Sequence, residues 1–74
     1  MNGVFWNCRG ADRTGMATSF SDLMKDHALS FICIQETKKR TFSASYLRKM
    51  DPFNLFSWNW IPSVGKSGGL ISGV

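Results

Sequence analysis

Polar side chains stand at the ends of two apolar segments in the first half of this chain. Asn7 closes a short apolar run, and Gln35 and Glu36 directly follow a second run at residues 31–34. In units that alternate strand and helix, side chains at strand ends often face a binding site. Asparagine also satisfies the backbone of turns, however, and a strand-end carboxylate can simply pair with a following lysine. These residue types indicate a candidate site and leave a purely structural role open.

The cysteines and the histidine give no second site. Cys8 and Cys33 have no further cysteine or histidine at metal-ligand spacing, and both lie in apolar runs. We expect two small buried thiols in a reducing compartment, with a disulfide between adjacent strands as the alternative. His27, the only histidine, falls on or beside the apolar stripe of an expected helix, so we expect a structural or surface role.

Net charge and hydropathy restrict the classes of partner. The formal net charge is +4 with a pI near 9.5, which favours an anionic partner such as nucleic acid or phosphate. Residues 38–40 form a basic cluster, although such short runs are usually solvated. No run approaches the roughly 20 apolar residues of a membrane span, and the first residues do not resemble a signal peptide. We expect a soluble, intracellular protein.

Hydrophobic periodicity predicts an α+β chain with about four strands and one or two helices. The expected strands cover residues 1–8, 30–35, 53–61 and 70–74, and the expected helices cover residues 16–28 and 41–50. The first strand, the first helix and the second strand form a βαβ-like unit, whose second strand should be buried on both faces. Residues 63–69 are glycine-rich and should form a loop, in which Gly68 and Gly69 permit close backbone packing. Trp58 and Trp60 should face the core.

Several segments together carry a resemblance to a known family. Residues 6–10, WNCRG, and residues 34–38, IQETK, resemble the first two motifs of the endonuclease/exonuclease/phosphatase superfamily. Residues 58–60, WNW, and residues 62–69, PSVGKSGG, look like the continuation found in endonuclease domains of plant non-LTR (LINE-type) retrotransposons. The segments span nearly the whole chain and follow one another in the family's order.

The resemblance implies a fold and a set of site residues. It implies a four-layer α/β/β/α sandwich, of which residues 1–74 would be a truncated domain supplying the N-terminal third. Glu36 would be the acidic ligand of a catalytic Mg²⁺ or Mn²⁺, and Asn7 would hydrogen-bond within the catalytic site. Mg²⁺ prefers hard oxygen ligands and often takes only one or two protein carboxylates. Arg9, Lys38 and Lys66 are candidates for contacting the nucleic-acid phosphate by charge.

The implied activity is metal-assisted phosphodiester hydrolysis on DNA by a nuclease of retroelement origin, for which a nuclear location would be suitable. The family's later tyrosine, its aspartate and asparagine pair, and its final aspartate and histidine have no counterparts before Val74, so this chain alone should be inactive. The alternative is a small basic module that binds nucleic acid without cleaving it, through Lys38, Lys39, Arg40 and exposed tryptophans. A translated remnant without function is a third reading. The oligomeric state is left open.

Overall fold

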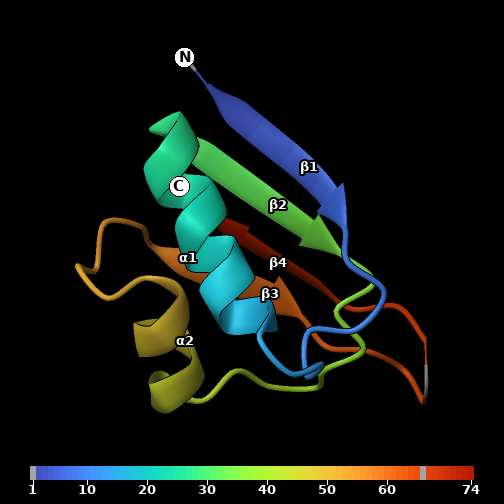
Figure 1. Cartoon of the computed structure of the whole chain (residues 1–74). Coiled ribbons are helices and arrows are strands. Elements are labelled where there is room, and N and C mark those ends of the chain that lie inside the picture. The colour runs from blue at the N-terminus through green and yellow to red at the C-terminus, as the bar shows by residue number, and fades with distance from the viewer. Residues whose placement is uncertain (1, 66) are drawn as a thin grey trace.

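The computed structural model describes residues 2–65 and 67–74, which form one mixed four-stranded sheet and two helices. The elements in chain order are β1 (Gly3–Asn7), α1 (Met16–His27), β2 (Phe31–Gln35), α2 (Ala44–Met50), β3 (Trp58–Ile61) and β4 (Leu70–Gly73). The strands lie in the order β1-β2-β4-β3, and both helices lie on one side of the sheet (Figure 1). The predicted α+β content is confirmed.

The predicted βαβ unit opens the fold. β1 and β2 pair in parallel, with Gly3 opposite Phe31 and Asn7 opposite Gln35, and α1 forms the crossover between them. α1 buries Met16, Phe20 and Met24, which recur every four residues on one face. The residue before its first turn is Gly15, which has a positive φ of 83° and gives no side-chain cap.

β4 completes the sheet between β2 and β3. It runs antiparallel to both neighbours, with Ile71 opposite Ile34 on one side and opposite Trp60 on the other. The connection from β3 to β4 contains an antiparallel bridge between Val64 and Ser67. Lys66, one of the candidate phosphate contacts, lies outside the described residues.

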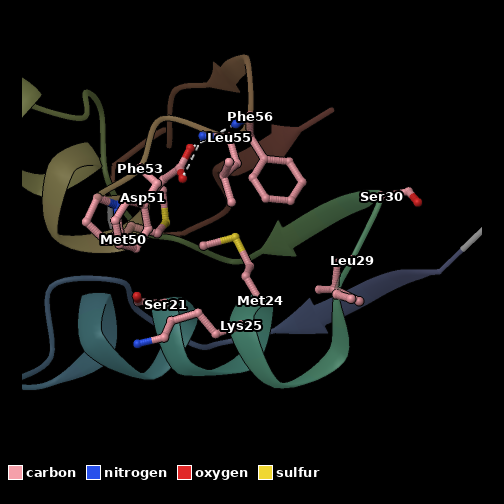
Figure 2. Close-up of a pocket in the computed structure, with 12 residues that line it drawn as sticks. Ser21, Met24, Lys25, Leu29, Ser30, Met50, Asp51, Phe53, Leu55 and Phe56 are labelled. Carbon is pink, nitrogen blue, oxygen red and sulfur yellow. Dashed lines mark hydrogen bonds between the residues drawn. The ribbon is translucent and has the colours of Figure 1, made fainter.

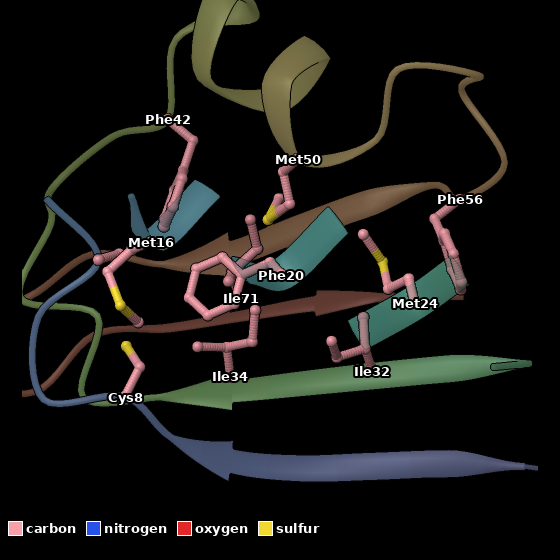
Figure 3. Packing of buried hydrophobic residues seen from close by; sticks show 11 residues of the cluster. Cys8, Met16, Phe20, Met24, Ile32, Ile34, Phe42, Met50, Phe56 and Ile71 are labelled. Carbon is pink, nitrogen blue, oxygen red and sulfur yellow. The ribbon is translucent and has the colours of Figure 1, made fainter. Parts of the chain in front are cut away.

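The core lies between the helices and one face of the sheet. Ile32, Ile34 and Ile71 point from the two central strands toward Phe20 of α1 and Met50 of α2 (Figure 3). All five are at most 1 % exposed. The prediction that β2 is buried on both faces is wrong. Its alternate residues, which face away from the helices, are half-buried or exposed, because both helices of the described residues cover the other face (Figure 1).

The aromatic segment before β3 is shorter as a strand than predicted. β3 begins at Trp58 rather than at residue 53, because the buried carboxylate of Asp51 fixes the preceding residues in a loop. Its Oδ1 accepts a hydrogen bond from Leu55 N at 3.0 Å, and its Oδ2 accepts from Phe56 N at 2.9 Å and from Trp58 Nε1 at 3.1 Å. A carboxylate that is hydrogen-bonded in this way replaces strand pairing for these backbone groups.

Two further features of the fold are the state of the cysteines and the length of the helices. Both cysteines are free: Cys8 is buried as expected, whereas Cys33 is only half-buried because it lies on the face of β2 away from the helices. No helix in the described part of the chain combines the length and the apolar composition needed to cross a bilayer.

Candidate functional site

The candidate site lies where the parallel strands β1 and β2 end. Asn7 is the last residue of β1 and stands opposite Gln35, the last residue of β2, so Glu36 follows at the same edge of the sheet. Asn7 is exposed and Glu36 is half-buried. The structure therefore places the two residues singled out from the sequence on neighbouring strand ends. The carboxyl ends of parallel strands are the usual place for ligand sites in such sheets.

Backbone hydrogen bonds continue the pairing beyond the strands. Cys8 N donates to Gln35 O at 3.0 Å, Gly10 N to Glu36 O at 2.8 Å, and Ala11 N to Thr37 O at 2.8 Å. The two chain segments that carry the site are thus held side by side for several residues. Three of these residues adopt the left-handed conformation, listed with φ in parentheses: Arg9 (57°), Glu36 (54°) and Lys38 (55°). Non-glycine residues adopt this region rarely, and such positions concentrate at functional sites.

The glycines before β4 border the site on its other side. Thr37 N donates to Gly69 O at 3.2 Å, and Lys38 N donates to Gly68 O at 2.9 Å. Gly69 has a φ of 87°, and a Cβ at that position would collide with the fully buried Thr37 side chain. This supports the predicted close packing at Gly69. At Gly68 a Cβ would meet nothing within 4 Å, so crowding does not require glycine there. The segment at Glu36 is consequently flanked by the loop after β1 on one side and by the β3–β4 hairpin connection on the other.

The oxygen donors at this edge are of the type that Mg²⁺ or Mn²⁺ prefers. Glu36 offers a carboxylate that has no hydrogen-bond or ion-pair partner among the described residues, and Asn7 offers an amide oxygen. Within residues 2–65 and 67–74, no three His, Cys, Asp or Glu side chains gather in one place. The donor set fits a magnesium ion held by one carboxylate and otherwise by water, which is the lower limit for such sites.

Basic side chains accompany the site. Arg9 and Lys38 are exposed, and neither has an ion-pair partner in the described part of the chain. A Cβ at Gly10 would lie 3.9 Å from Lys38 Cδ, so the stem of Lys38 extends over the loop that follows β1. Lys39 differs, because its Nζ lies 2.6 Å from Asp12 Oδ1 and its charge is already compensated.

A clasp, which we define as Asp12, Lys39 and Tyr46 with the main chain of Ala11, joins the loops that carry the site. Tyr46 Oη donates a hydrogen bond to Ala11 O at 2.6 Å. Lys39 Nζ lies 4.9 Å from the centre of the Tyr46 ring, within the range of a cation–π contact. Burial, together with the nearby Cys8 and Asp12, raises the pKa of Tyr46. The sequence indicated only a helix at Tyr46, because nothing in a single sequence pairs a tyrosine with a backbone oxygen 35 residues away.

Cys8 and His27 take no direct part in the site. The Cys8 thiol is buried beneath the first loop with its Sγ 3.7 Å from Glu36 O, and burial raises its pKa. A raised pKa keeps the thiol protonated and unreactive near neutral pH. His27 is exposed at the end of α1, where its carbonyl accepts a hydrogen bond from the Asn2 side chain. Asn2 precedes β1, so His27 lies at the opposite end of the strands from Asn7. This agrees with the predicted surface role.

The pocket in Figure 2 lies away from the candidate site. Its volume is about 310 Å³, and it opens between the second half of α1 and the loop after α2. Met24, Leu29, Leu55 and Phe56 dominate its walls, and none of its lining residues belongs to residues 7–11 or 36–39. Enclosure alone would place a ligand here, but Asn7, Glu36, Arg9 and Lys38 all lie at or just beyond the strand ends.

Comparisons with protein-family models, with curated proteins and with solved structures found no significant match to this chain. The functional assignment therefore depends on the motif residues and on where the fold places them.

Proposed function

We propose that this chain forms part of a divalent-metal-dependent phosphodiesterase site, of the endonuclease type that acts on DNA. The observation that carries the proposal is the parallel register of β1 and β2, which puts Asn7 and Glu36 on adjacent strand ends. These are the two positions at which the family motifs place an amide and an acidic metal ligand. Their juxtaposition depends on 28 residues of intervening chain folding back, so adjacency in the fold does not follow from adjacency in sequence.

Each residue of the candidate site has a distinct role in this proposal. Glu36 would hold the metal ion through its free carboxylate, and Asn7 would donate a hydrogen bond from its amide to a phosphate oxygen. A bound Mg²⁺ polarises a phosphoryl oxygen and stabilises the leaving alkoxide. Arg9 and Lys38 would position the phosphate backbone by charge. Hydrolysis also needs a base that deprotonates water. His27 cannot be that base, because it lies at the opposite end of the strands from Glu36.

The uncovered face of the sheet is compatible with the four-layer sandwich that the resemblance implies. In such a fold a second sheet packs on the face opposite the helices. In this chain that face carries Phe5, which is 70 % exposed, and Ile61, which is 64 % exposed. We therefore propose that the chain corresponds to the first helix layer and sheet of the sandwich.

Metal binding by Glu36 provides the direct test. We expect the purified chain to bind Mn²⁺ weakly, with a dissociation constant of roughly 0.1–1 mM or above, because one carboxylate supplies the protein charge. Binding is measured by the loss of the free Mn²⁺ signal in electron paramagnetic resonance. Glu36→Gln should abolish it, and Asp26→Asn, which removes an exposed carboxylate from α1, should leave it unchanged. Equal Mn²⁺ binding by the wild type and Glu36→Gln would refute the proposal.

A plasmid assay tests the expected lack of activity. With Mg²⁺ and supercoiled plasmid, we expect no nicking, since the described residues place one carboxylate and no base at the site. Nicking that disappears in Glu36→Ala would overturn this expectation and would make the chain an active nuclease.

The alternative function, nucleic-acid binding without cleavage, retains support from the exposed cations Arg9, Lys38 and Arg40. Its reliance on exposed tryptophans is wrong, because Trp6, Trp58 and Trp60 are half-buried and pack against the core. DNA affinity that falls steeply with salt and is unchanged in Glu36→Gln would favour this alternative. Mn²⁺ binding that is lost in Glu36→Gln would favour the metal site.

A further inference from the structure

The pocket between the second half of α1 and the loop after α2 is large enough for a small molecule (Figure 2). Its volume of about 310 Å³ is at the lower end of the range for ligand pockets, and an engineered apolar cavity of about 150 Å³ already binds benzene. We therefore expect it to hold a body about the size of two fused rings. The pocket lies on the helix side of the sheet, so a second sheet on the uncovered face would leave it accessible.

Apolar side chains form most of the pocket wall. Met24 and Met50 line it from the two helices and are 8 % and 0 % exposed. Phe53 and Leu55 line it from the loop, but they are 73 % and 72 % exposed, so water still reaches much of their surface. An apolar ligand would remove that surface from water, and methionine side chains adapt readily to the shape of such a ligand.

Two polar side chains of α1, Ser21 and Lys25, line the same pocket one helical turn apart. Ser21 is 8 % exposed, and its hydroxyl has no hydrogen-bond partner among residues 2–65 and 67–74. Lys25 is exposed and has no ion-pair partner in the same ranges. Helical side chains point back toward the N-terminus of their helix, and in Figure 2 the Lys25 side chain extends toward the turn that carries Ser21. A hydroxyl donor beside an ammonium group suits an anionic oxygen.

The acidic side chains near the pocket do not favour a cation in it. The Asp51 carboxylate already accepts three hydrogen bonds from N–H groups of residues 55–58, so its oxygens are engaged. Asp22 and Asp26, the acidic neighbours of Lys25 along α1, line a different hollow, between α1 and β1. The charge that the pocket offers to a ligand is therefore the positive charge of Lys25.

We propose that this pocket binds a small molecule with a compact apolar body and one anionic group. The body would pack against Met24, Met50 and Leu55, and the anionic oxygens would lie at Lys25 Nζ and Ser21 Oγ. A neutral ligand would leave both polar groups unused, and a cationic one would be repelled by Lys25. The volume suits a small molecule rather than a protein, since a specific protein interface covers about 800 Å² of each partner. The inference does not depend on the metal chemistry of Glu36.

Two probes, 2-naphthoate and 2-naphthamide, test the proposal, because they share one bicyclic body and differ in charge. Binding is followed by NMR of the chain labelled with ¹³C at its methionine methyl groups. Met24 and Met50 line the pocket, whereas Met16 belongs to the core and does not line it. We expect 2-naphthoate to shift the signals of Met24 and Met50 and to leave that of Met16 in place, with a dissociation constant of roughly 0.1–1 mM. The amide should bind about threefold to tenfold more weakly, because it cannot make a charge-assisted contact.

Matched variants separate the charge from the apolar wall. Lys25→Gln should weaken 2-naphthoate binding about threefold to tenfold and leave 2-naphthamide binding nearly unchanged. Lys49→Gln is its control, since Lys49 is exposed on α2 and does not line the pocket. Leu55→Ala should weaken the binding of both probes, and Ile61→Ala, which shortens a side chain that is 64 % exposed on the uncovered face, should weaken neither.

Three outcomes would overturn the proposal. The first is that the Met24 and Met50 signals stay in place at about 5 mM 2-naphthoate, a concentration above the expected dissociation constant. The second is equal affinity for the two probes, which would show that the pocket does not select an anion. This comparison uses the wild-type chain, so it holds even if a variant fails to fold by circular dichroism. The third is a shift of Met16 as large as that of Met24, which would indicate apolar binding without regard to the pocket.

Discussion

The phenolic oxygen of Tyr46 lies 2.6 Å from the backbone oxygen of Ala11, to which it donates a hydrogen bond. This contact connects α2 to the loop between β1 and α1, which carries Arg9. The salt bridge between Lys39 and Asp12 makes a second connection, from the segment after Glu36 to the same loop. The clasp thus fixes the two loops of the candidate site against each other and against the helix layer.

Tyr46→Phe should destabilise the chain by about 1–2 kcal/mol, because Ala11 O, which is part of a buried residue, loses its donor while the ring remains. Urea unfolding followed by tryptophan fluorescence measures the change. Ser19→Ala is the control, since Ser19 Oγ donates to Gly15 O at the exposed surface of α1, and its loss should change stability by less than about 0.5 kcal/mol. Equal effects of the two substitutions would show that the Tyr46 hydrogen bond stabilises the chain no more than an exposed helix hydrogen bond does.

Asp51→Asn should destabilise the chain by about 2–4 kcal/mol. The carboxylate is 7 % exposed and accepts three hydrogen bonds, two of them at Oδ2, so an amide group would direct its own hydrogens at one set of donors. Thermal unfolding by circular dichroism measures the loss. Asp26→Asn, on the exposed surface of α1, should leave the midpoint nearly unchanged. A midpoint for Asp51→Asn that equals the wild-type value would contradict the loop-fixing role.

Gly69→Ala should be more destabilising than Gly68→Ala. Both positions have positive φ, 87° and 77°, so both substitutions incur about 1 kcal/mol of backbone strain. At Gly69 the new methyl group would in addition collide with Thr37, whereas at Gly68 it would meet nothing within 4 Å. We expect a further loss of about 1–3 kcal/mol at Gly69, measured by urea unfolding. If the two variants were equally stable, the close approach of the hairpin to residue 37 would be in doubt.

Stability should fall as the pH rises above about 9. Burial raises the pKa values of Cys8 and Tyr46 in the folded chain, the former above its ordinary value of 9.0. Above the unfolded pKa values the unfolded chain releases these protons while the folded chain still retains them, so the free energy of unfolding decreases with pH. Below about pH 8 both groups are protonated in both states and contribute no pH dependence.

Urea midpoints measured from pH 7 to pH 10.5 follow this effect. The double variant Cys8→Ala, Tyr46→Phe should show a flatter decline than the wild type over the same range, although it is less stable at pH 7. An identical slope in the double variant would assign the alkaline loss to other groups.

Local sequence pattern determined most of the elements. The recurrence of Met16, Phe20, Leu23 and Met24 at steps of three to four residues predicted α1, because a helix needs only its own periodicity to present one apolar face. β2 was recognised from its continuous apolar run. The same run gave the wrong burial, because a run of apolar residues does not record whether one or two layers cover the strand.

Only the tertiary structure decided where the chemistry-bearing residues lie. The motifs named Asn7 and Glu36, but the in-register pairing of β1 with β2 is what brings them to one edge. The clasp and the Asp51 loop were not predicted, since each joins groups that only the folded chain brings together. Hydrophobic periodicity is a short-range property that can be read from a single sequence. Hydrogen bonding and packing between distant segments arise only when the chain folds, so a single sequence does not reveal them.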